Sequence, residues 1–269
     1  MSGTDQTAAS LFRAGRLDDA VAAAQAALRK APTDLNARVL LGELLAFTGN
    51  LERADVVLDA ASAIDPSTAM VVAEFRQLIR ADMARRQLFR DGRVPEFLAD
   101  PTETQRLQLA ALVALREGNL AEASRQAQAA EAVRPRAPGR HGDVAFDDMR
   151  DADDLLAGSF EVLTTTGKYF WIPVERVQTL EFHAPKRPRD LLWRRASMSV
   201  AQGPDGEVYL PAVYAGDDTA VTDALRLGRE TDWREAEGAP VRGVGQRLFI
   251  IGEDAVPMME LGNFQFSIA

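Results

Sequence analysis

Five aspartates lie within one short run, FDDMRDADDL at positions 146–155. Clustered carboxylates supply the oxygen ligands that Ca²⁺ prefers in proteins. The run nevertheless lacks the glycine and the closing bidentate glutamate of an EF-hand loop. We therefore expect no metal site here, and we interpret the run as an acidic helix start or a solvated connector.

Residues suited to nucleophilic or general-base catalysis are few. There is no cysteine, and the two histidines, His141 and His183, lack the HxxxH spacing of a metal site. The sequence contains neither a GxSxG elbow nor a P-loop lysine motif. The glycines at 243 and 245 precede an expected strand instead of opening a helix after one, which indicates a turn and not a nucleotide site. We expect no catalytic residues and no cofactor.

One alternative stays open. Aspartate, arginine and aromatic residues are dense at 147–171 and again at 226–233. Because arginine can form two parallel hydrogen bonds with one carboxylate, RLGR at 226–229 and DWR at 232–234 could hold a polar network that braces the fold. The same density would also suit a small-ligand-binding protein or an enzyme with a pocket at the domain junction.

The overall charge narrows the class of partner. The chain carries a formal net charge of −9 and has a pI near 4.9. Broad binding to nucleic acid or to an anionic membrane is disfavoured, because phosphates require a basic surface. We interpret the best local basic cluster as a solvated loop and strand face; its members are Lys186, Arg187, Arg189, Arg194 and Arg195.

The chain shows no sign of membrane insertion. No segment approaches the ~20 apolar residues of a membrane span, and the first thirty residues lack a basic start followed by an apolar run. The absence of cysteine suits a reducing compartment. We expect a soluble, cytoplasmic protein.

The first half of the chain contains a repeated hexapeptide. The hexapeptides GRLDDA, GNLERA and GNLAEA start at Gly15, Gly49 and Gly118, and a proline follows each glycine after 17 residues (32−15, 66−49 and 135−118). The first two copies are 34 residues apart (49−15), which is the tetratricopeptide period. The third lies 69 residues later (118−49), two periods with one residue inserted.

Each position of the repeat has a physical reason. Glycine permits the tight turn between two helices, and the alanine that closes the hexapeptide lets the paired helices approach closely. Proline ends the unit because it disfavours helix in the residue before it. Between the copies, 67–89 and 102–116 are predicted to be helices, the first stopped by Gly92. Such paired helices stack and leave a concave surface that holds a peptide or a helix.

From residue 160 the apolar period changes to that of strands. A helical or irregular insertion is expected at about 219–233. Short strands with frequent turns favour a small barrel or a curled sheet. We predict strands at 160–163, 168–172, 174–182, 191–200, 207–210, 246–251, 257–261 and 264–268, with turns at 166–167 and 203–206.

The predicted fold class is therefore α+β. Residues 1–140 form a tetratricopeptide-like helical repeat domain, 141–158 form an acidic linker, and 159–269 form a small β-barrel-like domain with a short helical insertion.

Several motifs, taken in order, resemble one protein family. They are GNLERA at 49–54, FDDMRD at 146–151, GKYFWIP at 167–173, RDLLWR at 189–194, EVYLPA at 207–212, LRLGRETDW at 225–233 and GQR at 245–247. Together they resemble the ImpE family, also called TagJ or SciE-type accessory proteins of bacterial type VI secretion. The resemblance spans roughly residues 10 to 268.

The resemblance implies a non-enzymatic accessory or adaptor protein. Proteins of this family are associated with the contractile sheath, and the N-terminal helix of the small sheath subunit is the partner we would expect. The resemblance implies no catalytic residues and does not settle the binding surface. An amphipathic helix binds through apolar anchors, so our first candidate is the inner face of the second repeat, around Leu41, Leu44, Leu45 and Phe47. Internal packing would explain the same four residues.

Overall fold

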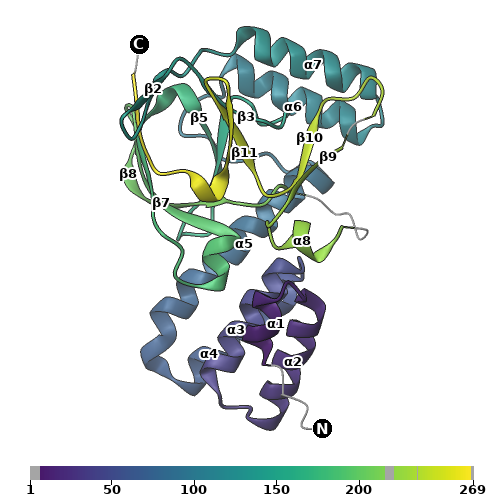
Figure 1. The fold of residues 1–269 in the computed structure, drawn as a ribbon, viewed down its shortest axis with the longest axis vertical. Coiled ribbons are helices and arrows are strands. Elements are labelled where there is room, and N and C mark those ends of the chain that lie inside the picture. Colours follow the sequence, from purple (N-terminus) through teal and green to yellow (C-terminus); the bar gives the residue numbers. More distant parts are fainter. Residues whose placement is uncertain (1–6, 216–220, 235, 268–269) are drawn as a thin grey trace.

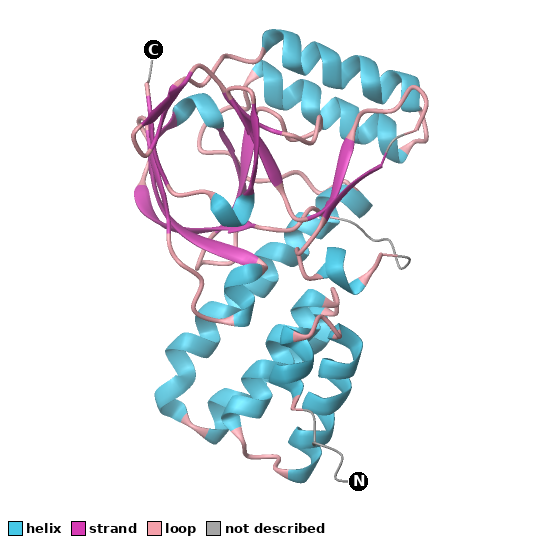
Figure 2. Ribbon diagram, viewed as in Figure 1, coloured by secondary structure: helices cyan, strands magenta, loops and turns pink. Residues whose placement is uncertain are grey.

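The computed structural model describes residues 7–215, 221–234 and 236–267 (Figure 1). The first half of the chain is helical and the second half is built mainly from strands (Figure 2). The class is α+β, as predicted. The helices of the first half are α1 (Ala8–Arg13), α2 (Leu17–Lys30), α3 (Leu35–Phe47), α4 (Leu51–Ile64), α5 (Ala69–Asp91), α6 (Glu103–Arg116) and α7 (Leu120–Val133).

The turns that the repeat predicts are present at all three glycines. Gly15, Gly49 and Gly118 have φ values of 79°, 76° and 75°, in the left-handed region that glycine enters without a steric penalty. They lie between α1 and α2, α3 and α4, and α6 and α7. The alanine that closes each hexapeptide is fully buried between the paired helices; these are Ala20, Ala54 and Ala123. The tetratricopeptide-like repeat is confirmed.

The third helical hairpin lies apart from the first two. Helix α5 runs from the α1–α4 group to the sheet, and α6 and α7 lie at the opposite end of the molecule (Figure 1). Helix α5 ends at Gly92, where φ is 80°, as predicted. Helix α6 then begins at a capping box formed by Thr102 and Gln105. The helical half is therefore divided by its longest helix and flanks the sheet at two places.

The strands form one large sheet and two small ones. The eight-stranded sheet has the order β2-β1-β13-β6-β7-β8-β4-β5, and a three-stranded sheet (β12-β11-β3) and a ribbon (β10-β9) lie beside it. No ladder among the described residues joins β2 to β5, so the large sheet curls like a barrel but stays open. The strands are β1 (Gly139–His141), β2 (Val144–Phe146), β3 (Met149–Asp151), β4 (Ser159–Leu163), β5 (Tyr169–Pro173), β6 (Val177–Phe182), β7 (Trp193–Val200), β8 (Asp205–Pro211), β9 (Thr231–Arg234), β10 (Arg242–Gly245), β11 (Leu248–Ile251), β12 (Asp254–Pro257) and β13 (Asn263–Phe266).

Several local expectations differ from the structure. The turn expected at the glycines 243 and 245 is strand β10, which pairs with β9. The strand expected from 174 begins only at Val177, after a 3₁₀ turn at Val174–Arg176. The segment 141–158 is no solvated linker, because it contributes β2 and β3 and pairs with β11. The strand expected at 257–261 is a 3₁₀ turn, Met258–Glu260, that follows β12. The expected insertion contains one short helix, α8 (Asp223–Arg226), and then β9; its residues 219–220 lie outside the described part of the chain.

The helices and the sheet share a continuous apolar core. The side chains of Trp171 on β5 and Trp193 on β7 are almost fully buried together with the apolar faces of α3, α4 and α5. Phe75 of α5 meets Trp193 edge to face, with ring centroids 6.0 Å apart. A second core fills the inside of the curled sheet, around Phe160 and Phe249. The helical half is thus packed onto the sheet and not merely tethered to it.

Candidate functional site

The structure places the four predicted partner-binding residues in the interior of the helical half. Leu41, Leu44, Leu45 and Phe47 lie on α3 and are at most 4% exposed. Phe47 packs on Phe12 of α1, with ring centroids 5.3 Å apart. All four side chains are packed inside the core of the helical half. A partner that binds α3 must therefore contact other residues of that helix.

An accessible apolar groove lies next to these residues. It has a volume of about 290 Å³ and is formed by α1, α3 and the loop between β6 and β7. Phe12 and Leu40 belong to its floor, and both pack against the core that contains the four α3 residues. We call it the α1/α3 groove; its lining is Ala9, Phe12, Arg13, Leu40, Pro185, Lys186, Arg187, Pro188 and Leu191.

The basic cluster noted in the sequence is divided between interior and surface. Arg189 and Arg194 are at most 5% exposed, and Arg195 forms an ion pair with a glutamate on the neighbouring strand. Only Lys186 and Arg187 of this cluster are exposed at the α1/α3 groove. With Arg13 they give the groove a basic rim, although the protein as a whole is acidic.

A buried ionic network joins α5 to the sheet. Arg85 of α5 donates two hydrogen bonds to Glu161 of β4, each 2.9 Å long. Arg247 and the hydroxyl of Tyr169 donate to the same carboxylate, and Trp171 Nε1 donates to Tyr169 Oη over 2.6 Å. All five side chains are at most 3% exposed. The network therefore links α5 to the sheet at the junction between the two halves.

Burial and the arginines act in opposite directions on Glu161. Burial alone would raise the pKa of this carboxyl group, because it disfavours the charged form. The positive charges of Arg85 and Arg247, and the hydrogen bonds to the carboxylate, lower the pKa to about 2. The carboxylate of Glu161 is therefore ionised and hydrogen-bonded to both arginines.

The aspartate run of 146–155 contributes two buried carboxylates. Asp151 accepts a hydrogen bond from Tyr214 Oη (2.9 Å), while its distance to Arg247 Nε is 3.5 Å. Since that arginine is engaged mainly by Glu161, burial prevails and raises the pKa of Asp151. Burial and the adjacent Asp151 raise the pKa of Asp153 to about 7. These carboxylates brace strands and turns.

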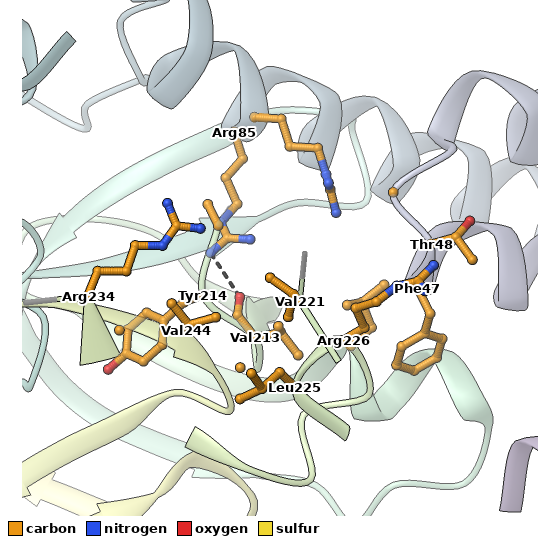
Figure 3. Close-up of a pocket in the computed structure, with 16 residues that line it drawn as sticks. Phe47, Thr48, Arg85, Val213, Tyr214, Val221, Leu225, Arg226, Arg234 and Val244 are labelled. Atoms are coloured by element: carbon orange, nitrogen blue, oxygen red, sulfur yellow. Dashed lines mark hydrogen bonds between the residues drawn. The ribbon is translucent and has the colours of Figure 1, made fainter. Parts of the chain in front are cut away.

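A second hollow, of about 350 Å³, opens at the junction itself (Figure 3). It lies between the end of α3, the C-terminal part of α5, α8 and the ribbon β10-β9. The junction is therefore not packed solid, as the ligand-binding alternative requires. Every charged residue among its described lining is an arginine; these are Arg85, Arg86, Arg226 and Arg234.

Within the described ranges, no three histidine, aspartate or glutamate side chains are grouped as ligands for a metal ion. No helix in the part of the chain that the structure describes is long and apolar enough to cross a membrane.

Comparison with known proteins assigns the family. The model of the family described as ImpE protein matches residues 143–265, and a tetratricopeptide repeat model matches residues 11–73. A Pseudomonas aeruginosa protein named type VI secretion system accessory component TagJ is 36% identical over 261 residues, which cover 96% of this chain and 90% of that protein. The chain belongs to the ImpE/TagJ family.

The fold is also shared with a solved structure. The crystal structure of protein VPA1032 from Vibrio parahaemolyticus superposes on this ImpE-family chain with a TM-score of 0.90, at 27% identity and with 97% of each chain covered. Two of the motifs that resemble the family contain residues of the buried ionic network. GKYFWIP contains Tyr169 and Trp171 of the buried network, and GQR ends with Arg247.

Sequence reasoning missed the members of this network. Glu161 lies in an apolar stretch, where alternation along β4 would direct one face to solvent. Instead every residue of β4 is buried, because α5 covers the face that alternation assigns to water. Two features of the sequence could have indicated the network: Arg247 in the GQR motif, and Glu161 as the charged residue of an otherwise apolar strand.

Proposed function

We propose that this ImpE-family chain is a non-enzymatic adaptor of bacterial type VI secretion that acts in the cytoplasm. In this proposal it binds the N-terminal helix of the small contractile-sheath subunit. The family relationship and the name of the Pseudomonas aeruginosa relative support an accessory role. The tetratricopeptide-like repeat supports binding of a peptide or helix, since stacked helical hairpins present such surfaces.

The α1/α3 groove is the observation that carries the proposed binding mode. An amphipathic helix binds by placing its apolar face in a groove, with anchors at intervals of three or four residues. The groove offers a largely apolar floor that includes Phe12, Leu40 and Leu191. Its basic rim of Arg13, Lys186 and Arg187 would face the polar side of the bound helix. We therefore propose that this polar side is acidic.

The four α3 residues predicted from the sequence lie beneath the groove in this proposal and do not contact the partner. Leu44 and Phe47 follow Leu40 by four and seven positions on α3, which places them on the same face of the helix. Phe12 covers Phe47, so these residues support the groove from inside. A rigid wall of this kind reduces the ordering cost of binding.

A peptide titration tests the proposal. A labelled peptide that covers the N-terminal helix of the small sheath subunit is titrated with the full chain and followed by fluorescence anisotropy. We expect saturable binding that weakens with salt, because screening reduces the attraction between exposed charges. Reversing the rim with Lys186→Glu and Arg187→Glu together should weaken the affinity about tenfold, which corresponds to about 1.4 kcal/mol.

A matched variant controls for net charge. Arg29→Glu with Lys30→Glu makes the same change of charge at exposed positions on α2 that do not line the groove, and its affinity should equal that of the wild type. Equal weakening by both double variants would assign the effect to net charge and reject the groove. Absence of binding to both the peptide and the intact sheath subunit would reject the proposed partner.

A further inference from the structure

We propose that the hollow at the junction is a binding site for a small organic anion, one phosphate or carboxylate group attached to a compact apolar body. We call this hollow the junction cavity. Its volume of about 350 Å³ lies within the range of small-molecule sites, about 300–1,000 Å³. The inference does not depend on the proposed adaptor function, because the α1/α3 groove has a different lining.

The charged part of the lining is positive. Arg85, Arg86 and Arg226 come from two different helices, and Figure 3 shows Arg85, Arg226 and Arg234 around the space next to Val213. None of the described lining residues is an aspartate or a glutamate. Within the described lining, an anion would therefore meet guanidinium groups and no carboxylate; Arg226 is itself paired with Asp18 and Asp223, which lie outside that lining.

Carboxylates behind the wall hold two of these arginines in place. Glu161 accepts two hydrogen bonds from Arg85, whose Nη2 also donates to the carbonyl of Val213 over 3.0 Å. Asp82 accepts one hydrogen bond from Arg86 Nε, 3.1 Å long. Neither carboxylate lines the cavity. The arginines are thus oriented before a ligand arrives, which lowers the cost of binding.

Arg86 has donors left for a ligand. A guanidinium group has five N–H donors, and the hydrogen bond that the structure gives Arg86 among the described residues uses Nε alone. Its Nη1 reaches the turn at Gly49, where a β-carbon would lie only 2.8 Å away. Gly49 therefore serves the cavity as well as the turn, because any larger residue would displace this arginine.

The rest of the wall is apolar and closely built. Leu192, Val213, Val221 and Val244 contribute aliphatic surface. Gly243 lies against the ring of Tyr214 so closely that a β-carbon there would be 2.1 Å from a ring atom. A compact apolar body could fill this part while its acidic group meets the arginines, which bind phosphate and carboxylate through paired hydrogen bonds.

Calorimetric titration of the full chain tests the proposal with three probes. Phenyl phosphate compared with inorganic phosphate gives the contribution of the apolar body, and benzoate compared with phenyl phosphate gives the preference between carboxylate and phosphate. Sodium chloride at equal ionic strength controls for screening. We expect one-to-one binding of phenyl phosphate or benzoate that is tighter than that of inorganic phosphate, with a matching rise in Tm. If none of the three binds saturably, or if sodium chloride reproduces the rise, the site does not exist.

Two variants locate the binding, and one controls for charge. Arg86→Gln should weaken binding at least about tenfold, because a charge-assisted hydrogen bond is lost. Val244→Phe keeps every charge and fills the cavity, so it should abolish binding even if Arg86→Gln perturbs folding. Arg125→Gln removes the same charge from an exposed position on α7 and should bind like the wild type. Wild-type affinity in Val244→Phe, or equal weakening by both glutamine variants, would overturn the proposal.

Discussion

Replacing Glu161 with glutamine tests whether the buried network holds the helices to the sheet. The wild-type carboxylate accepts two hydrogen bonds from Arg85 and one each from Arg247 and Tyr169. Glutamine has nearly the same shape but no charge, and its amide nitrogen is a donor that would face other donors. The two buried guanidinium groups would then lose their hydrogen-bonded counter-charge and keep only the longer contacts of Arg85 with Asp82 (3.6 Å) and of Arg247 with Asp151 (3.5 Å).

The expected loss is large for a single substitution. Removing one partner of a buried ion pair costs about 3–5 kcal/mol, since the charge that remains is buried and unpaired. Folded proteins are stable by only about 5–15 kcal/mol. For a chain of this size each kcal/mol lowers Tm by about 2–4 °C, so Tm should fall by about 6–20 °C.

Urea unfolding followed by circular dichroism measures the loss, and Glu207→Gln is the matched control. Glu207 also pairs with an arginine on a strand, but its side chain is 42% exposed. Its loss should cost less than about 1 kcal/mol. Similar destabilisation by the two variants would refute the view that the buried network holds the junction.

The pH dependence gives a second readout of Glu161→Gln. The pKa of Glu161 is about 2 in the folded protein and 4.5 as its ordinary value. The carboxylate therefore stabilises the fold above pH 4.5, and this contribution is lost as the pH falls towards 2. The difference in free energy of unfolding between the wild type and the variant should shrink across that window. A constant difference would show that charge is not the cause.

Three further outcomes follow from the structure. Burial raises the pKa of the Glu43 carboxyl group from 4.5 to about 7. The unfolded chain therefore loses the Glu43 proton at lower pH than the folded protein, and the free energy of unfolding decreases between pH 4.5 and 7. Urea unfolding at a series of pH values should show a smaller decrease for Glu43→Gln than for the wild type. Gly118→Ala should lower the free energy of unfolding by about 1 kcal/mol, because φ at this position is +75°, although nothing lies within 4 Å of the added methyl group. Gly206→Ala places a methyl group in equally open space at an ordinary φ, so it should lower the free energy of unfolding much less in the same assay. Tyr169→Phe should destabilise by about 1–3 kcal/mol in thermal unfolding, because the buried N–H of Trp171 loses its acceptor.

The adaptor proposal and the anion-site proposal concern surfaces on either side of α3. Phe12 belongs to the α1/α3 groove, and Phe47, which packs on Phe12, lines the junction cavity. The groove joins α1 and α3 to the β6–β7 loop, while the cavity joins α3 and α5 to α8 and β10. Both surfaces therefore consist of residues from the helical half and from the β-rich half.

Much of the architecture follows from local sequence. The hexapeptide repeat predicts three left-handed turns, and each is present with φ between 75° and 79°. The stop of α5 at Gly92, the β4–β5 hairpin and the turn between β7 and β8 also agree with their predictions. These features depend on backbone conformation and on apolar periodicity within a few residues, which a single sequence displays directly.

The tertiary structure decided what lies inside and which distant residues meet. The aspartates at 146–155 look solvated in sequence, yet Asp151 and Asp153 are buried because β3 pairs with β11, about a hundred residues later. The alternation of β4 predicts an exposed Glu161, yet α5 brings Arg85 onto that face. Burial and pairing of charges depend on contacts across the whole chain, so neither the network nor the two surfaces could be located before the helices and the sheet were placed together.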